Sequence, residues 1–257
     1  MQYRIVRLAK GNGSYREIAI PSKEDRLRLR GLLPELERIL DRLDKQRANY
    51  AFQRNRNCAQ MALRHVGYRY TLSMDLKDFF ESVTSAHVQR VVPNAILQQC
   101  LIDGRAKQGL PTSPIISTIA FLPVDMRISA ALDKLRLGAV YTRYADDLVF
   151  SFDDHKVAGR IQTAVRQIVS ECGFRVNERK TRLQDARNGR TVITGISVDR
   201  HGLHATRRTK KRLRAAVHQE NQDSLAGLAE WAKCKLPGIQ CAARAVDHPQ
   251  SHSPSPK

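Results

Sequence analysis

The chain has 257 residues, 42% of them hydrophobic, enough to bury a core in one large domain or in a main domain with a small addition. Its 44 Lys and Arg against 25 Asp and Glu give a net charge of +19, which favours a polyanionic partner, above all a nucleic acid. No uninterrupted apolar run approaches the roughly 18 residues of a membrane-spanning helix, and residues 1–10 lack the apolar core of a secretion signal. We therefore expect no membrane partner and a cytoplasmic location.

The five cysteines are odd in number and show no C-x-x-C spacing, which argues against a zinc site and a disulfide framework. They are Cys58, Cys100, Cys172, Cys234 and Cys241. Reduced, mostly buried thiols are the simplest interpretation, as is typical of cytoplasmic proteins.

The first part of the chain predicts extended segments followed by helices. Residues 1–24 predict short strands interrupted by Gly11-Asn-Gly13, and residues 24–43 carry Leu and Ile at helical spacing, with Pro34 as an interruption. The next predicted elements are a helix at 59–66, a strand at 68–76 and a mainly helical stretch at 85–100.

The second part begins with Ser113-Pro114, predicted as an N-cap with Pro at the first helical position, which opens a long apolar helix towards Leu137. The elements after it are a hairpin at 140–152, a helix at 157–172 ending at Gly173, a strand at 191–198 and a basic helix at 206–219. The tail from Pro249 predicts disorder. Helices mixed with antiparallel strands, without regular βαβ alternation, predict an α+β fold.

Two adjacent carboxylates lie at the tip of the predicted hairpin, in Tyr144-Ala-Asp-Asp147. Asp is a good turn residue, so turn formation alone could account for them. A third carboxylate, Asp75, ends a strand flanked by apolar residues, where its burial needs a cationic neighbour. If this strand lies beside the hairpin, the three carboxylates converge and favour a hard cation such as Mg²⁺. Two such ions stabilise the attacking and leaving oxygens of phosphoryl transfer.

Between these clusters lies Lys107-Gln-Gly-Leu-Pro-Thr-Ser-Pro114. Gly109 would let a ligand approach the backbone, and the helix N-terminus that follows favours a phosphate. A loop before a helix often has this composition, so the segment is informative only together with the two acidic clusters.

The combined segments resemble reverse transcriptases, and within them the bacterial retron type, over roughly residues 10–235. The turn Tyr144–Asp147 looks like the family's catalytic turn, and Asp75 with Phe79-Phe80 looks like its first metal-binding segment. Three further segments are similar to family motifs: Gln108–Pro114 at the templating pair, Gly173–Thr181 in the later palm, and Tyr15–Pro21 in the fingers.

Two features bear on the retron type. Retron enzymes carry Asn-Ala-x-x-His where this chain has Met61-Ala-Leu-Arg-His65, and Val-Thr-Gly where it has Ile193-Thr-Gly195. Other bacterial reverse transcriptases, including defence-related and group II intron-related enzymes, stay open as alternatives.

The resemblance implies a right-hand polymerase with fingers, a palm of antiparallel sheet and helices, and a small helical thumb. The expected divisions are fingers at 1–67, palm with intervening fingers elements at 68–198, a basic helical thumb at 199–248 and a disordered tail at 249–257.

The resemblance also implies a two-metal catalytic centre. Asp75 and Asp146, with the backbone at Leu76, would bind two Mg²⁺ ions, and Asp147 would support them; Mn²⁺ would be a substitute for Mg²⁺. Lys180 would donate a proton to the leaving pyrophosphate; the alternative is a solvated surface lysine.

The incoming nucleotide would be held by residues from the fingers and palm. Arg16 and Lys10 would clamp the triphosphate, since a guanidinium matches phosphate oxygens, while Gln108 and Gly109 would line the nascent base pair. Phe80 would pack under the sugar and exclude a 2′-hydroxyl; core packing is the alternative for this ring.

The basic helix would grip the template–primer duplex at the start of the thumb. Residues 201–219 contain six cations and no acid: Arg207, Arg208, Lys210, Lys211, Arg212 and Arg214. A solvated helix face is the alternative. His65 would either contact RNA or serve as a satisfied structural histidine.

The sequence therefore predicts an RNA-directed DNA polymerase that copies a dedicated structured non-coding RNA, in the retron manner and in antiphage defence. Its expected partners are that RNA, an RNA–DNA hybrid, dNTPs and an effector protein. A catalytically idle RNA-binding protein is opposed by the intact carboxylates, and an RNA-copying RNA polymerase is opposed by Phe80.

Overall fold

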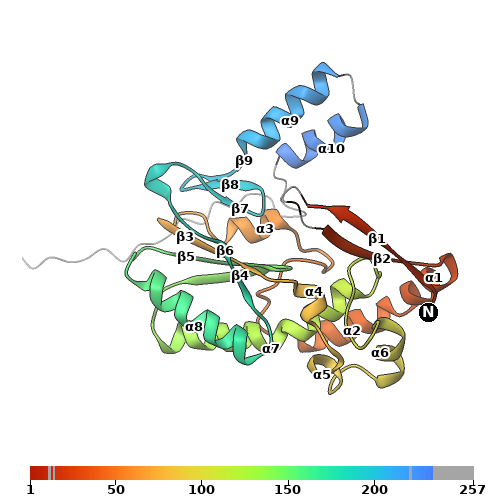
Figure 1. Cartoon of the computed structure of the whole chain (residues 1–257). Helices are drawn as coiled ribbons and strands as arrows, with labels where there is room; N and C mark the ends of the chain where they lie inside the picture. The colour runs from red at the N-terminus through yellow and green to blue at the C-terminus, as the bar shows by residue number, and fades with distance from the viewer. Residues whose placement is uncertain (11–12, 14, 220–221, 234–257) are drawn as a thin grey trace, which may run out of the picture.

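The computed structural model describes residues 1–10, 13, 15–219 and 222–233 (Figure 1). The tail from Pro249, which we expected to be disordered, lies outside these residues. Strands β1 (Tyr3–Ala9) and β2 (Tyr15–Pro21) form an antiparallel hairpin, as predicted. They are followed by α1 (Lys23–Gly31) and α2 (Leu33–Leu43), which separate just before Pro34.

A four-stranded antiparallel sheet forms the centre of the molecule, in the order β4-β5-β3-β6. Its strands are β3 (Tyr70–Leu76), β4 (Val140–Tyr144), β5 (Asp147–Phe152) and β6 (Val176–Asp185). The first three were predicted, whereas β6 was not.

One face of this sheet packs on α7 (Ser113–Lys134) and α8 (Val157–Glu171) (Figure 1). Among the described residues, α7 alone has the length and hydropathy of a membrane span, but 67% of its apolar window is buried inside the protein. It is the core helix of the fold. It begins one residue earlier than predicted, because Thr112 and not Ser113 occupies the N-cap.

The other face of the sheet is covered by α3 (Cys58–Leu63) and by a second, three-stranded sheet. That sheet contains β7 (Thr191–Ile193), β8 (Ile196–Asp199) and β9 (Gly202–Ala205). Val149 of β5 packs with Met61, Ile193 and Ile196 in this layer. The single strand predicted at 191–198 is thus a hairpin, and the expected palm boundary at residue 198 falls inside β8.

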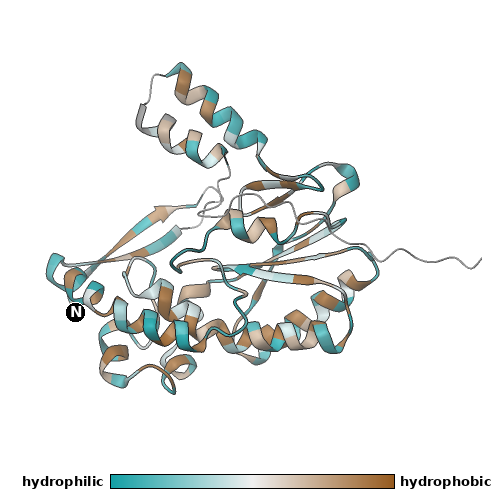
Figure 2. Ribbon diagram, turned by 180° about the vertical axis from the view of Figure 1, so that it is seen from behind, coloured by the Kyte–Doolittle hydropathy of each residue, from teal (hydrophilic) through white to brown (hydrophobic). Residues whose placement is uncertain are grey.

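Short helices and a helical pair complete the described chain. The short elements are α4 (Phe79–Ser82), α5 (Ser85–Val88), α6 (Asn94–Cys100) and the 3₁₀ turn Ala186–Asn188. Helices α9 (Arg207–His218) and α10 (Gln222–Ala232) pack on each other and project beyond the β7–β9 sheet (Figure 1). Much of α9 is hydrophilic, as the hydropathy colouring shows (Figure 2). The predicted α+β class is confirmed.

Candidate active site

Strand pairing brings the three carboxylates to one end of the central sheet. Asp75 of β3 lies directly opposite Asp147 of β5, and only Ala145 and Asp146 connect β4 to β5. The Leu76 N–H donates to the Asp146 carbonyl at 2.9 Å, which ties the two segments together. The expectation that the strand of Asp75 lies beside the hairpin is confirmed.

The carboxylate turn, Tyr144-Ala145-Asp146-Asp147, has an unusual backbone. Ala145 has φ +56°, whereas Asp146 is not among the described residues with positive φ. This is the pattern of a type II′ turn, which prefers Gly at the first central position. A non-Gly residue in this region costs on the order of 1 kcal/mol and persists where surrounding contacts enforce it.

Asp75 is nearly buried and is held by two side chains of β6. Its Oδ2 accepts from Asn177 Nδ2 at 3.0 Å and its Oδ1 from Lys180 Nζ at 2.8 Å. Asn177 is the pairing partner of Asp75 across β3 and β6. The hydrogen bond to Asp75 raises the pKa of Lys180. The cationic neighbour that a buried Asp75 requires is therefore present.

Asp146 and Asp147 form no ion pair with a described residue, and nearby cations offset only part of the rise in their pKa values. Burial, with the charges of Asp146 and Asp75 added, raises the pKa of Asp147 to about 6. Burial and the Asp75 charge also raise the pKa of Asp146, while Lys180 and Arg16 oppose the rise. Additional positive charge nearby would therefore stabilise the ionised form of each carboxyl group.

The donor set fits a hard divalent cation. Three carboxylates at one sheet end supply anionic oxygen ligands, and the Lys180 ammonium occupies the position of a cation against Asp75. In the part of the chain that the structure describes, no three Asp, Glu, His or Cys side chains are already gathered at coordination distance. Both oxygens of Asp75 already accept hydrogen bonds from β6, at Asn177 and Lys180.

Arg16, on β2, is exposed, and it lies near enough to Asp146 for its charge to oppose the rise in the pKa of that carboxyl group. Lys10 is exposed just beyond β1, and its carbonyl accepts from the Gly13 N–H at 3.1 Å. The two proposed triphosphate ligands thus belong to the same hairpin.

The adjacent rings of Phe79 and Phe80 have different surroundings. Phe79 is buried against Phe121 and Phe174. Phe80 is half-buried, with its ring centroid 6.3 Å from that of the exposed Phe52. Phe80 is accordingly accessible from outside the core, unlike Phe79.

Gly109 serves a contact within the chain. The Gln108 carbonyl accepts from the Ala19 N–H at 2.8 Å, and a Cβ on Gly109 would lie 2.3 Å from the Ala19 carbonyl oxygen. The missing side chain of Gly109 admits β2, and its expected contact with a ligand stays a prediction. The contact joins the Gln108 segment to the strand that carries Arg16.

His65 does not reach a surface where it could contact RNA, and that expectation was wrong. The ring is buried, with Nδ1 2.9 Å from Ser151 Oγ and Nε2 2.6 Å from Thr142 Oγ1. Burial lowers its pKa to about 3. His65 is a neutral structural histidine that joins the end of α3 to the central sheet.

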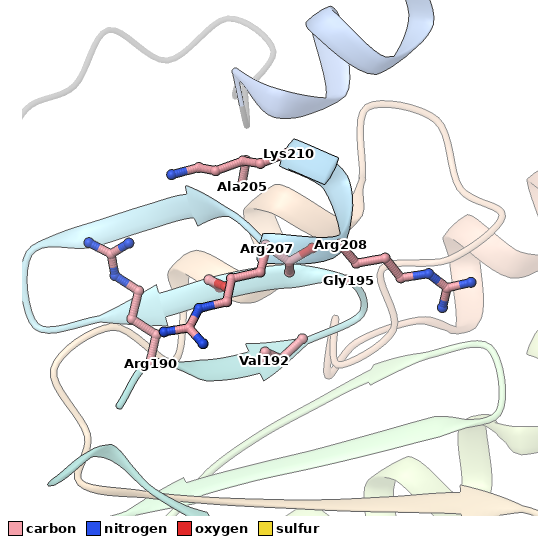
Figure 3. A pocket seen from close by; sticks show the side chains of 9 residues that line it. Arg190, Val192, Gly195, Ala205, Arg207, Arg208 and Lys210 are labelled. Atoms are coloured by element: carbon pink, nitrogen blue, oxygen red, sulfur yellow. The ribbon is translucent and has the colours of Figure 1, made fainter. Parts of the chain in front are cut away.

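The six cations of α9 are exposed and fall into two sets. Arg207, Arg208 and Lys210 line a groove of about 740 Å³ between α9 and the β7–β9 sheet, together with Arg190. Figure 3 shows Arg207 extending along the sheet towards Arg190. The second set, Lys211, Arg212 and Arg214, does not line this groove.

Two residues of these sites were not predicted individually. Asn177 lies within the Gly173–Thr181 segment, and only the pairing of β3 with β6 shows that it contacts Asp75. Arg190 lies just before β7, and only the fold brings it to the first turn of α9.

Comparisons with known proteins agree with this geometry. Residues 8–192 match the family described as "Reverse transcriptase (RNA-dependent DNA polymerase)". The chain is 34% identical over 242 residues to the retron Mx65 reverse transcriptase of Myxococcus xanthus, a match covering 80% of this chain and 56% of the relative. It is 28% identical over 228 residues to the retron Ec86 reverse transcriptase of Escherichia coli, covering 84% and 69%. The chain thus spans little more than half of the Mx65 relative.

Solved structures share the fold at low sequence identity. A telomerase from Candida tropicalis in complex with a telomeric RNA fragment gives a TM-score of 0.60 at 11% identity, covering 90% of this chain and 52% of that one. A foamy viral protease-reverse transcriptase in complex with an RNA/DNA hybrid gives 0.52 at 17% identity, covering 90% and 27%. From the family match and the assembled carboxylates, we conclude that the chain belongs to the reverse transcriptase (RNA-dependent DNA polymerase) family.

Proposed function

We propose that this chain is an RNA-directed DNA polymerase whose chemistry takes place at the carboxylate turn. The observation that carries the proposal is the convergence of Asp75, Asp146 and Asp147 at one sheet end, with raised pKa values for Asp146 and Asp147. Carboxylates whose pKa values are raised by burial and by one another would be stabilised in their ionised form by a divalent cation, as metal-dependent phosphoryl transfer requires.

Asp75 and Asp146 would be the principal ligands of two Mg²⁺ ions, with the Leu76 backbone and Asp147 in support, and Mn²⁺ as a substitute. When bound, such ions supply charge neutralisation and activation of the attacking hydroxyl. Lys180 would move from Asp75 to the leaving pyrophosphate and donate a proton there. Asn177 would keep Asp75 in place while Lys180 moves, because it bonds the other carboxylate oxygen.

The nucleotide would lie between the β1–β2 hairpin and the carboxylates. Arg16, with Lys10, would hold the triphosphate. Gln108 would contact the nascent pair, and the packing of Gly109 on Ala19 would set its distance from Arg16. The half-buried Phe80 would lie under the sugar and exclude a 2′-hydroxyl.

The cations of α9 would neutralise phosphates of the template–primer hybrid. Arg190 would join them, because it lines the groove with Arg207, Arg208 and Lys210. In the proposed division into fingers, palm and thumb, the β7–β9 sheet would be the junction between palm and thumb.

The curated relatives favour the retron type among bacterial reverse transcriptases. On that basis the template would be a structured non-coding RNA, the primer a 2′-hydroxyl within it, and the product a branched RNA–DNA molecule. A role in antiphage defence, with an effector protein in the cytoplasm, belongs to the same proposal.

Primer extension on an RNA template tests the polymerase proposal. The wild-type chain should incorporate dNTPs with Mg²⁺ and reject rNTPs, whereas Phe80→Val should admit rNTPs. Phe79→Leu is the matched control, because it perturbs the neighbouring buried ring and should leave sugar choice unchanged. Failure to extend, or equal use of rNTPs by the wild type, would contradict the proposal.

Sequencing of nucleic acid that copurifies with the chain tests the retron part separately. A DNA joined to RNA through a 2′-linkage supports it. Unbranched DNA would assign the chain to another bacterial class while leaving the polymerase proposal intact.

A further inference from the structure

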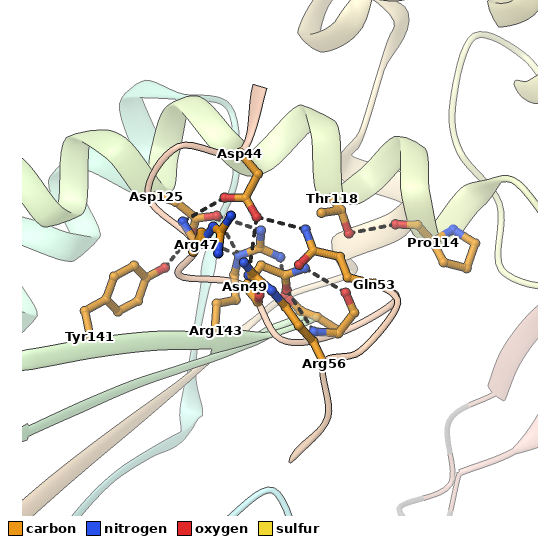
Figure 4. A network of polar contacts seen from close by, with 12 residues as sticks. Asp44, Arg47, Asn49, Gln53, Arg56, Pro114, Thr118, Asp125, Tyr141 and Arg143 are labelled. Atoms are coloured by element: carbon orange, nitrogen blue, oxygen red, sulfur yellow. Dashed lines mark hydrogen bonds and ion pairs between the residues drawn. The ribbon is translucent and has the colours of Figure 1, made fainter. Parts of the chain in front are cut away.

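Asp125 of α7 and Arg143 of β4 form an ion pair enclosed by the protein, with side-chain exposures of 1% and 0%. Arg143 Nε lies 2.9 Å from Asp125 Oδ1 and Nη2 lies 2.7 Å from Oδ2. Tyr141 donates its hydroxyl to the same Oδ1 at 2.6 Å (Figure 4). Apolar residues of similar volume often stabilise a fold as well as a buried ion pair does. Stability alone is therefore a weak explanation for this pair.

The position of Arg143 suggests a more specific role. Arg143 pairs with Leu148, so its side chain lies on the core face of the sheet, facing α7. Its remaining nitrogen, Nη1, donates to the Ala145 carbonyl at 3.1 Å. Ala145 is the residue with φ +56°, immediately before Asp146. The bond therefore holds the carbonyl of Ala145, the turn residue whose positive φ disfavours an alanine.

The backbone of Arg143 is held as firmly as its side chain. Its N–H donates to the Ala48 carbonyl, and its carbonyl accepts from the Tyr50 N–H, both at 2.8 Å. Segment 48–50 thus borders the edge of β4 that does not pair with β5, while Asp125 of α7 holds the guanidinium on the core face of the sheet. These contacts fix the turn relative to α7 and to segment 48–50.

We propose that Asp125 and Arg143 are a positioning pair for the carboxylate turn. By holding the Ala145 carbonyl, they keep Asp146 and Asp147 facing Asp75 before any cation binds. The Arg143 side chain lies on the opposite face of the sheet from Asp75 and Asp147, so it would act on the site through the turn and not by contact with nucleotide or metal. The inference rests on the proposed function of the turn and adds to it the residues that preorganise the site.

Replacing both charged side chains together distinguishes a role in positioning the turn from a contribution to the stability of the fold. The variant Asp125→Leu/Arg143→Met replaces both charges with apolar side chains, so the core is left without an unpaired ion. Arg143→Lys is the second variant: it keeps a charge for Asp125 but loses the planar fork that reaches the carboxylate and Ala145 together. Leu132→Ala is the matched control, a buried α7 residue that should lower the unfolding midpoint without altering the turn.

Three readouts are compared: the unfolding midpoint, Mn²⁺ binding to the nucleic-acid-free chain by titration of the free-ion electron paramagnetic resonance signal, and kcat and KM for a dNTP. We expect both pair variants to stay folded, with Mn²⁺ affinity and kcat each reduced on the order of 10- to 100-fold, as for other residues that orient ligands. The KM for the dNTP should change much less. Leu132→Ala should lose stability and keep its Mn²⁺ affinity.

The inference is overturned if a folded pair variant binds Mn²⁺ and polymerises as the wild type does, or if Leu132→Ala loses Mn²⁺ affinity to the same extent. If the double variant fails to fold, Arg143→Lys decides by the same criteria. A wild type that binds Mn²⁺ but makes no DNA would contradict the proposed function alone, and the Mn²⁺ comparison would still decide on the positioning pair.

Discussion

Lys180 Nζ lies 2.8 Å from Asp75 Oδ1, so the lysine proposed as a proton donor is paired with a carboxylate proposed as a metal ligand. The lysine side chain is 63% exposed, whereas that of Asp75 is 10% exposed. Lys180 can therefore move into solvent or towards a substrate, while Asp75 cannot leave the sheet. We expect cation binding to release Lys180 for its role at the pyrophosphate.

Replacing Lys180 with Met should lower the single-nucleotide incorporation rate on the order of 100-fold at saturating dNTP, because the proton donor is lost. Lys180→Arg should restore charge but little rate, since a guanidinium is a poor acid. The rate is measured by rapid quenching, with Arg179→Met as the control on the same exposed part of β6. A Lys180→Met enzyme that keeps the wild-type rate would show that the lysine is only a structural partner of Asp75.

Divalent-ion affinity should fall as the pH drops below about 6. The pKa of Asp147 is raised to about 6, and a carboxylate must lose its proton to bind a metal, so protons compete with the ion below that pH. For one competing proton, affinity falls roughly tenfold per pH unit. Mn²⁺ titration between pH 5 and 7.5 measures the effect, and Asp147→Asn should show a weaker pH dependence. A flat wild-type profile would be incompatible with a raised Asp147 pKa.

Stability should respond to pH through His65. Its pKa is about 3 in the folded chain and about 6.5 when unfolded, so the unfolded state binds the proton more tightly. The stabilisation is complete above pH 6.5 and is lost as the pH falls towards 3, at about 1.4 kcal/mol per pH unit. The raised pKa of Asp147 acts in the opposite sense between about pH 4 and 6, because there the folded state holds the proton.

A comparison of variants isolates the histidine contribution. His65→Gln keeps hydrogen-bonding capacity without a titrating group, so the difference in unfolding free energy from the wild type should shrink steadily from pH 6.5 to pH 4.5. Urea unfolding at several pH values measures it, with the exposed His201→Gln as control. A difference that stays constant with pH would mean that His65 does not titrate as a buried neutral ring.

The carboxylate site was predictable from sequence because its parts are local and chemically distinctive. Asp75 ends an apolar strand, and Asp146 and Asp147 lie at the tip of an apolar hairpin, so alternation and turn chemistry place them without knowledge of the fold. The hairpin at Thr194-Gly195 could have been predicted in the same way, because a Gly between two runs of β-forming residues favours a tight turn. In the structure both residues have positive φ, as in a type I′ turn. The prediction of a single strand at 191–198 overlooked this glycine.

Other features depend on tertiary structure. Strand β6 reads Val-Asn-Glu-Arg-Lys-Thr-Arg-Leu-Gln-Asp and is largely exposed at a sheet edge, so it lacks the apolar alternation of a half-buried strand. Arg143 was overlooked within an apolar strand, where a charge requires a partner. Its partner Asp125 lies on a different element, and no spacing rule connects them.

The cations of α9 should control affinity for nucleic acid and leave the chemical step largely unchanged. Changing Arg208, Lys211 and Arg212 to Gln keeps good helix formers and removes up to three phosphate contacts. The log–log salt slope of template–primer binding should then become shallower by roughly two to three units, at 0.7–0.9 per contact. Single-nucleotide addition at saturating template–primer should change little.

The control for this triple variant changes Lys134, Lys156 and Arg160 to Gln, on the α7–α8 side of the sheet, which removes the same charge elsewhere. Titration at several salt concentrations compares the two variants. Equal slopes for the α9 variant and the wild type would place α9 against solvent or a protein partner.

The central claim is that Asp146 acts through its charge at a metal-dependent polymerase centre, and Asp146→Asn tests it most directly. Asn is well tolerated in a turn, so the fold and template–primer affinity should stay near wild type. Single-turnover extension of a primer on an RNA template, with dNTPs and Mg²⁺, should fall by at least about 100-fold, because a carboxylate ligand is lost at the reacting phosphate. Near-normal extension by a folded Asp146→Asn chain would contradict the assignment of the carboxylate turn as the catalytic centre.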